Sequence, residues 1–283
     1  MSVINTNVSA MFAQNTLTAN SRAQSTSMQQ LSTGSRVNSA RDDAAGLAIG
    51  QNMTSQIRGL NQAVKNANDG ISMLQTADGA MSTQSDMLQR MNELAVQSAT
   101  GTNSDVQRGY LNTEFQALST QINKIATGTL WNGKSVLTGT AGDTGGATFT
   151  LQTGQGASNT TTATIVAMGS DGLGLTSGSG ATAVAQIDSQ AHAGTAIGLI
   201  ETAIGKVNTQ RANIGAVTNQ LTYAADNMTN ISSNVNASRS QIMDTDYAQA
   251  TTQLAKTQII QQAATAMLAQ ANQQPQSVLA LLK

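Results

Sequence analysis

The most regular feature of the chain is a stripe of apolar residues between residues 53 and 88. Its members are separated by alternating steps of four and three residues, a spacing typical of helices that pack as coiled coils. Two polar members, Asp78 and Ser85, interrupt it. The stripe predicts one long helix over about residues 44–99 and consists of Met53, Ile57, Leu60, Val64, Ala67, Ile71, Leu74, Asp78, Met81, Ser85 and Leu88.

Two later stripes have the same spacing. Because a helix cannot bury its apolar stripe alone, the three helices are predicted to pack together as a bundle. The shorter stripe follows the break TGTNSD and consists of Leu111, Phe115, Leu118, Ile122 and Ile125. The longer one consists of Ile214, Val217, Leu221, Ala224, Met228, Ile231, Val235, Ser238 and Ile242.

Residues 128–190 lack helical spacing and are rich in Gly, Ser and Thr. The Asn-Gly pair in LWNGKSVLTG is typical of a tight turn, and the runs GGATFTLQTG and TTTATIVAMG predict two short strands. We therefore expect a small, loop-rich β excursion from the bundle rather than a separate enzyme domain.

The two ends of the chain keep helical periodicity but are poor in charge. Residues 1–35 contain one charged side chain, Arg22, and residues 258–283 contain none before Lys283. Pro275 is expected to begin a last short helical piece. The N-terminal stripe begins with Ile4, Val8 and Met11, and the C-terminal one consists of Tyr247, Ala250, Leu254, Thr257, Gln261, Ala264, Leu268 and Ala271.

These terminal stripes have little within the chain to cover them. Isolated helices of this quality are marginal in water, so we expect both ends to be largely unstructured in the free monomer. Other copies of the chain would cover the stripes, and uncharged amides and hydroxyls avoid the cost of burying unpaired charges. The ends are predicted to drive self-association, because disordered tails are usually rich in charge or proline.

The composition argues against several classes of function. The formal net charge is −1 without a basic block, which argues against nucleic acid as the main partner. No apolar run approaches the roughly 18 residues that span a bilayer, so membrane insertion is not expected. The chain has no cysteine and no catalytic pattern of Ser, His and acid, so neither an enzyme nor a cofactor is predicted. Asp188 and His192 have a metal-like spacing, but with one histidine in the chain we expect no metal site.

Four blocks of the sequence closely resemble bacterial flagellin. The blocks LSTGSRVNSARDDAAGLAIG, RGLNQAVKNANDGISMLQTADGAM and QRMNELAVQSATGTNSD resemble the N-terminal region of that family. AKTQIIQQAATAMLAQANQQPQSVLALLK, at the other end, resembles its C-terminal region. Trp131 is a departure, since the family more often has phenylalanine before the Asn-Gly pair.

The resemblance implies a mainly α fold. It consists of a long-helix, coiled-coil-like bundle (D1) with a small β-hairpin region, and of paired terminal helices (D0). Residues 1–43 and 244–283 would form the two D0 helices. Residues 44–190 would form the N-terminal D1 helices and the β-hairpin region, with 128–190 as a short variable middle, and 191–243 the C-terminal D1 helix.

The implied function is structural. The chain would be secreted and would self-assemble into the extracellular filament of the bacterial flagellum, which serves swimming motility. Its partners would be other copies of itself, the flagellar export apparatus, an export chaperone and the filament cap. The D0 polymerisation stripe would consist of Ile4, Val8, Met11, Tyr247, Leu254, Leu268, Leu279 and Leu282.

A second implied surface lies on D1. It matches the family surface that the flagellin-sensing Toll-like receptor of animals reads and that also contacts neighbouring subunits. Arg90 and Leu94 are four residues apart and would share a helical face. The surface consists of Gln89, Arg90, Leu94 and Glu114.

The stretch NSARDDAAG is expected to begin the long helix. Asn38 or Ser39 would cap it, with Asp42 and Asp43 in the first turn, where carboxylates favour the positive end of the helix dipole. The family places this stretch in the spoke between D0 and D1, where the acids would alternatively pair with a neighbouring subunit.

Two other classes of protein fit parts of the pattern. A cytoplasmic chemoreceptor-like helical module shares the heptads, but it predicts a membrane anchor or an acidic surface that this chain lacks. A surface glycan-binding adhesin would use residues 128–190, and binding assays on that segment would distinguish it.

Overall fold

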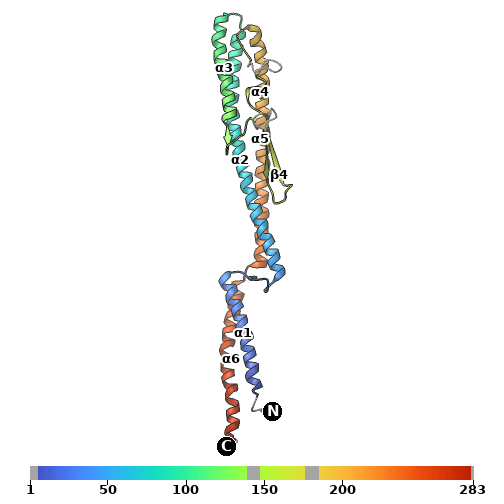
Figure 1. Cartoon of the computed structure of the whole chain (residues 1–283), viewed down its shortest axis with the longest axis vertical. Coiled ribbons are helices and arrows are strands. Elements are labelled where there is room, and N and C mark those ends of the chain that lie inside the picture. Colours follow the sequence, from blue (N-terminus) through green and yellow to red (C-terminus); the bar gives the residue numbers. More distant parts are fainter. Residues whose placement is uncertain (1–5, 139–146, 176–184, 282–283) are drawn as a thin grey trace. The chain divides into compact units, whose positions relative to one another are not determined.

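A computed structural model describes residues 6–138, 147–175 and 185–281, with only the backbone for residues 274–281 (Figure 1). The predicted Ile4 and Leu282, and the side chain of Leu279, lie outside the described part. The chain divides into two compact units, residues 58–232 and residues 1–57 with 233–283. Two long helices, α2 (Ala44–Ala99) and α5 (Gln190–Met243), contribute to both units, and α2 confirms the helix expected at 44–99.

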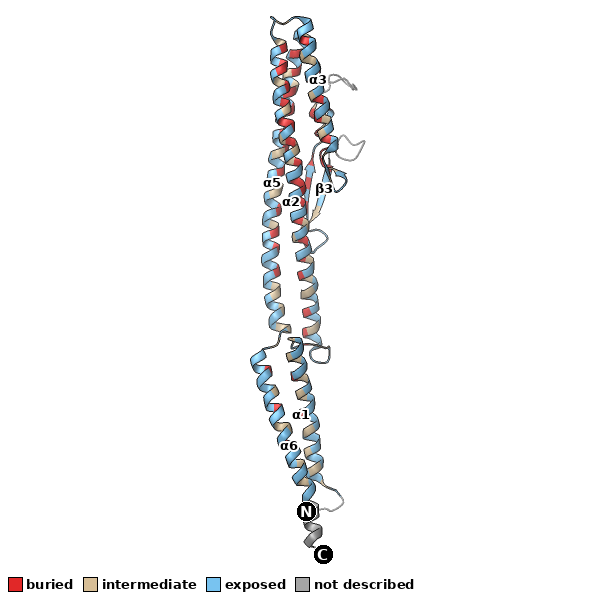
Figure 2. Ribbon diagram, turned by 90° about the vertical axis from the view of Figure 1, so that its left-hand side faces the viewer, coloured by how far each residue is buried: buried red, intermediate tan, exposed pale blue. Residues whose placement is uncertain are grey.

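The unit of residues 58–232 is a bundle of α2, α3 (Asp105–Gly128) and α5. The predicted stripe of α2 faces the interior, since its members from Leu60 to Leu88 are all buried or half-buried (Figure 2). The α3 stripe is inside as well. The α5 stripe is inside from Ile214 to Met228 but reaches the surface at Ile231, which is 37% exposed.

Two antiparallel hairpins confirm the expected turn and strands. β1 (Leu130–Trp131) pairs with β2 (Lys134–Ser135) through Asn132 and Gly133, whose φ angles of 49° and 78° suit a tight turn. β3 (Ala147–Gln152) pairs with β4 (Thr160–Ile165), with Ala147 opposite Ile165. Alternate residues of β4 are buried, because one face of the hairpin lies against the bundle.

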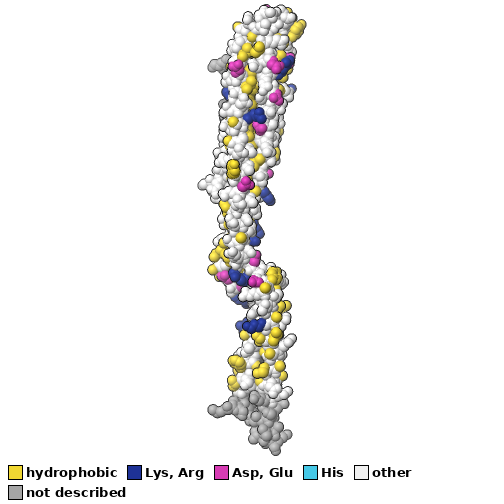
Figure 3. All heavy atoms as spheres, turned by 180° about the vertical axis from the view of Figure 1, so that it is seen from behind, with side chains coloured by type: hydrophobic (Ala, Val, Ile, Leu, Met, Phe, Trp, Pro, Cys, Tyr) yellow, Lys and Arg dark blue, Asp and Glu magenta, His cyan; other side chains and the backbone are white. Residues whose placement is uncertain are grey.

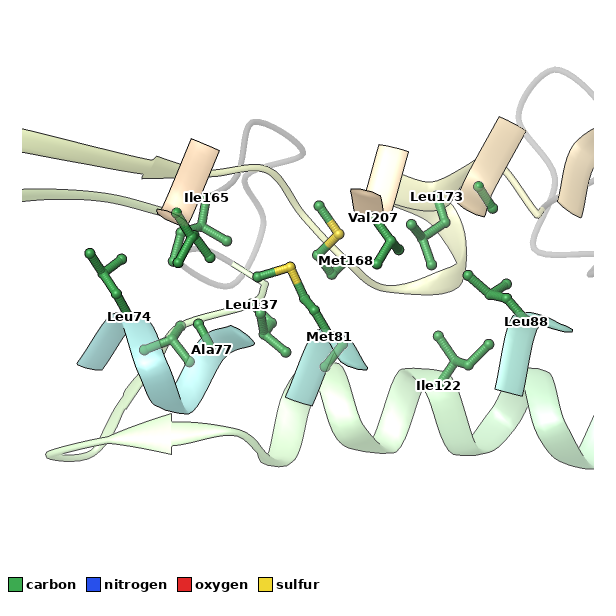
Figure 4. Packing of buried hydrophobic residues seen from close by; sticks show 14 of the residues in the cluster. Leu74, Ala77, Met81, Leu88, Ile122, Leu137, Ile165, Met168, Leu173 and Val207 are labelled. Atoms are coloured by element: carbon green, nitrogen blue, oxygen red, sulfur yellow. The ribbon is translucent and has the colours of Figure 1, made fainter. Parts of the chain in front are cut away.

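The segment after α3 completes the bundle's core and is more than a loop-rich excursion. Leu137, Ile165 and Met168 are fully buried, as is Leu173 of α4 (Ser170–Leu173). Figure 4 shows them facing Leu74, Met81 and Leu88 of α2, Ile122 of α3 and Val207 of α5.

A buried arginine holds the connection between α2 and α3. The guanidinium of Arg108 donates to the main-chain carbonyls of Ser98, Thr100 and Asn103, at the end of α2 and in the loop. These carbonyls lack helical partners, so the arginine satisfies them in place of water. Ser104 and Gln107 form a capping box that begins α3.

In the other unit, α1 (Val8–Thr33) pairs with α6 (Tyr247–Leu281), and the two helices lie side by side in Figure 1. The expectation of unstructured ends differs from this structure, in which each helix covers part of the other. α6 also runs through Pro275 without ending, so the separate last piece expected there is wrong. α1 ends at Gly34, whose φ of 69° is a conformation that glycine adopts readily.

Candidate functional site

The register of the α1–α6 pair is fixed by two asparagines of α1. Asn7 donates a 2.7 Å hydrogen bond to the carbonyl of Ala271, and Asn20 donates one of the same length to the carbonyl of Thr257. The first partner lies near the end of α6 and the second lies further back, so the helices run antiparallel. Asn7 also accepts from the amide of Ala10 and thereby caps α1.

Among the described residues of the pair, those that are buried are small or polar. The residues buried along it are Asn20, Ser27, Ala250, Thr257 and Ala264. Small side chains let the two helices approach closely, and the amide–carbonyl bonds satisfy the polar groups within the interface.

The predicted C-terminal stripe therefore has a partner within the chain. Its members from Ala250 to Ala271 are all buried or half-buried, including Leu254 and Leu268, and they face α1. The expectation that little within the chain covers this stripe is corrected, because α1 covers part of it. Tyr247 is the exception, exposed at the start of α6 beside Gly34.

Several other large apolar side chains of the pair point outward. Val8, Met11 and Phe12 are 64%, 57% and 75% exposed, and they lie on the face of α1 turned away from α6. Ile259 and Met267 of α6 are 67% and 66% exposed. We call these five the outer apolar residues; Figure 3 shows apolar side chains spread over the described surface of the pair.

Three of the outer apolar residues, Phe12, Ile259 and Met267, do not belong to the predicted stripes. The predicted N-terminal stripe steps from Val8 to Met11 and passes over Phe12 on the same face, whereas Ile259 and Met267 lie off the C-terminal stripe. The sequence does contain a sign of these residues: each terminal helix has large apolar residues besides those of its predicted stripe. Val8 and Met11 were predicted and do lie on the surface.

Charge is almost absent from the pair. Arg22 is the one charged residue in the sequence of α1, and Lys256 is the one charged residue in that of α6. Both side chains are exposed.

On the bundle, the predicted D1 surface is centred on an ion-paired cluster. Nε of Arg90 lies 3.0 Å from a carboxylate oxygen of Glu114, and Nη1 lies 2.9 Å from Glu93. The hydrogen bond to Glu93, followed by the one to Glu114, raises the pKa of the Arg90 guanidinium. Gln89 beside it is exposed.

Leu94 does not share the exposed face of Arg90. It is 1% exposed and belongs to the bundle's core, so the expectation of an apolar surface contact there is wrong. Leu88, Met91, Leu94 and Ala95 are all buried, so Leu94 lies on the core side of α2 while Arg90 stays in solvent.

The start of α2 differs from the expected cap. Asp43 itself is the cap, accepting from the amide of Gly46 at 2.8 Å, and neither acid lies in the first turn. Asp42 accepts from the amides of Asn38 and Ser39 and from the Ser39 hydroxyl, which lowers the pKa of Asp42, the hydroxyl most. Asn38 donates to the carbonyl of Ser35 rather than capping the helix.

The Asp188–His192 pair is a surface contact. Nδ1 of His192 lies 2.6 Å from the Asp188 carboxylate, with both side chains largely exposed. Across the residues that the structure describes, no three His, Cys, Asp or Glu side chains gather where they would hold a metal ion. In the same part of the chain, no helix is long and apolar enough to cross a membrane.

Two family models match the chain. The bacterial flagellin N-terminal helical region matches residues 4–142, and the bacterial flagellin C-terminal helical region matches residues 197–282. The matched regions contain both helices of the α1–α6 pair, together with α2, α3 and most of α5.

Named relatives match over nearly their full length. The chain is similar to the flagellar filament 33 kDa core protein of Treponema phagedenis, with 42% identity over 99% of this chain and 100% of that protein. It is also similar to flagellin A of Vibrio cholerae, with 37% identity over 99% of each chain. Among solved structures, a putative flagellar hook-associated protein from Vibrio parahaemolyticus covers 72% of this chain and is itself covered completely, at a TM-score of 0.60. Its 15% identity shows a shared fold alone.

Proposed function

This chain belongs to the bacterial flagellin family, and we propose that its outer apolar residues form the surface through which copies assemble. Flagellins are structural proteins, so the chain is a subunit of the extracellular flagellar filament that serves motility. The family assignment gives no support to a chemoreceptor-like module or an adhesin.

The proposal rests on one observation: the α1–α6 pair buries polar side chains and exposes large apolar ones. Its interior contains Asn20, Ser27 and Thr257, whereas Phe12 and Ile259 are exposed. Covering a large apolar side chain is favourable by about 1.5–3 kcal/mol, so five such residues strongly favour contact between copies. The near absence of charge keeps the desolvation cost of that contact low.

Electron microscopy of purified full-length protein after salting-out tests the proposal. Wild-type protein is expected to form filaments, and Phe12→Ser with Ile259→Ser is expected to prevent them while leaving the far-ultraviolet circular dichroism unchanged. Leu130→Ser removes an exposed apolar side chain from the bundle's first hairpin and is the matched control. Normal filaments from the double variant would refute the assignment of this surface.

A second role is favoured by the exposed cluster around Arg90. We propose that Gln89, Arg90 and Glu114 are the side chains through which a flagellin-sensing Toll-like receptor reads the monomer. The planar guanidinium of an arginine presents several hydrogen-bond donors. In this cluster the carboxylates of Glu93 and Glu114 hold the Arg90 guanidinium in place. Leu94 lies behind this surface and acts on it by packing α2 in the core.

Receptor signalling by monomers at equal concentration tests this second role. Arg90→Ala with Glu114→Ala is expected to weaken the response. Asp78→Ala with Arg211→Ala removes another partly exposed ion pair of the same bundle and is the matched control. Equal dose–response curves for the wild type and the first variant would reject the role and leave the filament function untouched.

The remaining partners follow from the route by which such a filament grows. We propose that the flagellar export apparatus, an export chaperone and the filament cap handle this chain before it joins the polymer. Its α1–α6 pair supports this, because an uncovered apolar surface needs a partner before assembly. Co-purification of a chaperone with the wild type, and its loss with the Phe12 and Ile259 variant, is the expected result.

A further inference from the structure

The two cations of the α1–α6 pair lie at the same level of the pair. Arg22 is two residues beyond Asn20, and Lys256 is one residue before Thr257, which is the hydrogen-bond partner of Asn20. Because the helices are antiparallel, Arg22 and Lys256 are displaced from the Asn20–Thr257 hydrogen bond in the same direction along the pair. Neither cation has an ion-pair partner among the described residues, and neither helix sequence contains an acid.

The loops at the end of the same pair carry the opposite excess of charge. Residues 34–43 and 244–246 lie together, since Ser35 bridges to Asp244 and the amide of Arg36 donates to the carbonyl of Met243. They contain Arg36 and Arg41 against the four acids Asp42, Asp43, Asp244 and Asp246, which gives a net charge of −2. We call this surface the acidic junction.

The acids of the junction are exposed and held in place. Asp43 accepts from the amide of Gly46, Asp246 from the amide of Ala248, and Asp244 from the Ser240 hydroxyl. Each carboxylate retains further lone pairs, because it accepts about four hydrogen bonds in all. The nearby guanidinium of Arg36 is directed at the carbonyl of Ile242, 2.7 Å away.

We infer that Arg22 and Lys256 of one copy pair with the acidic junction of a second copy, displaced along the helices. This inference rests on the proposed assembly through the α1–α6 pair. The excess of +2 on the pair and −2 on the junction match, and every copy supplies one of each. Within one copy, the two cations are too far from the acidic junction to pair with it. Arg22 lies twelve residues before Gly34, which is about 18 Å along a helix.

The pairing gives the assembly a defined axial position. Apolar contact between the outer apolar residues is not directional, so it leaves neighbouring copies free to slide. Charges that must meet their opposites penalise a slipped position, because a cation covered without a partner is costly. The expected displacement between paired copies is about 18 Å.

Charge reversal in the full-length chain tests the inference. Arg22→Glu with Lys256→Glu is expected to raise the critical concentration for assembly about tenfold or more, equivalent to about 1.4 kcal/mol. Adding Asp42→Lys and Asp244→Lys to the same chain restores complementarity and is expected to restore assembly. These two acids are chosen because neither caps a helix. Lys124→Glu with Lys134→Glu, on exposed bundle positions, is the matched control.

Cross-linking tests whether Arg22 of one copy lies near the acidic junction of another, without changing any charged residue. The chain has no cysteine, so Ser21→Cys with Ala40→Cys places the only two thiols beside Arg22 and in the junction. Ser21 lies about 18 Å before the end of α1, beyond the reach of a short bifunctional maleimide. Filaments are expected to yield ladders of covalently linked copies, and monomers none.

The outcomes separate this inference from the proposed assembly surface. Filaments of the cysteine variant without cross-linked copies, or charge-reversed chains that assemble at the wild-type concentration, would overturn the pairing alone. A four-fold reversed chain that stays as defective as the two-fold one would also overturn it. Failure of the wild type to form filaments, by contrast, would count against the assembly function itself.

Discussion

The side-chain amide of Asn20 in α1 donates a 2.7 Å hydrogen bond to the main-chain carbonyl of Thr257 in α6, and both residues are buried. In most helix pairs this interior position is filled by a large apolar residue. Here an asparagine fixes the register, and the outer apolar residues are left for contact with other copies. Fixing one register of paired helices is the best-attested use of a buried polar group.

Replacing Asn20 by alanine is expected to loosen the α1–α6 pair. The variant loses a buried hydrogen bond, worth about 1 kcal/mol, and leaves a small gap. Hydrogen exchange of the α1 amides should accelerate accordingly, while amides of the α2–α3 bundle stay unchanged. Asn15→Ala, on the exposed side of α1, is the control and is expected to leave exchange unaffected.

Lysine at two adjacent positions of α6 is expected to have different effects. Leu268 faces α1, so Leu268→Lys should disrupt the pair already in the monomer, seen as lost helical circular dichroism. Met267 is 66% exposed, so Met267→Lys should leave the monomer helical and block filament formation. Identical behaviour of the two monomers would contradict the orientation of α6.

Two glycine-to-alanine changes are expected to differ in sign. Gly34 has a φ of 69°, and a Cβ there would lie 3.0 Å from the Tyr247 hydroxyl. Gly34→Ala should therefore destabilise the end of α1 by about 1–2 kcal/mol. Gly79 lies within α2 with open space around it, so Gly79→Ala should stabilise by about 0.5–1 kcal/mol. Thermal unfolding followed by circular dichroism distinguishes the two variants.

The turn before α2 is expected to depend on pH through Asp42. Its pKa is lowered from an ordinary 3.8, chiefly by the Ser39 hydroxyl, so the ionised form stabilises the turn. That contribution is present above the ordinary pKa and is lost as the pH falls through the lowered value. Carboxyl chemical shifts of Asp42 should show a midpoint below 3.8. Ser39→Ala should move the midpoint upward, and an unchanged midpoint would contradict the assigned cause.

The sequence by itself determined the bundle and its hairpins. The stripe from Leu60 to Leu88 predicted both the extent of α2 and its buried face, because helical spacing puts those residues on one side of the helix. Asn132 and Gly133 likewise predicted the first hairpin turn, since few other residues adopt positive φ at low cost. The resemblance of both ends to flagellin identifies the family without reference to any tertiary contact.

Only the tertiary structure decided which side of each terminal helix is covered. Periodicity shows which residues share a face but not which segment packs on it, so it does not reveal that α1 covers part of Leu254 and Leu268. The resemblance places Leu94 on the receptor surface, and its step of four residues from Arg90 does not show that the boundary between core and solvent runs between them. The cap of α2 depended on where the helix begins, and the hydrogen bond from the Gly46 amide selects Asp43 over Asn38. These contacts join residues far apart in the chain or depend on the exact start of a helix, and spacing along the sequence contains neither.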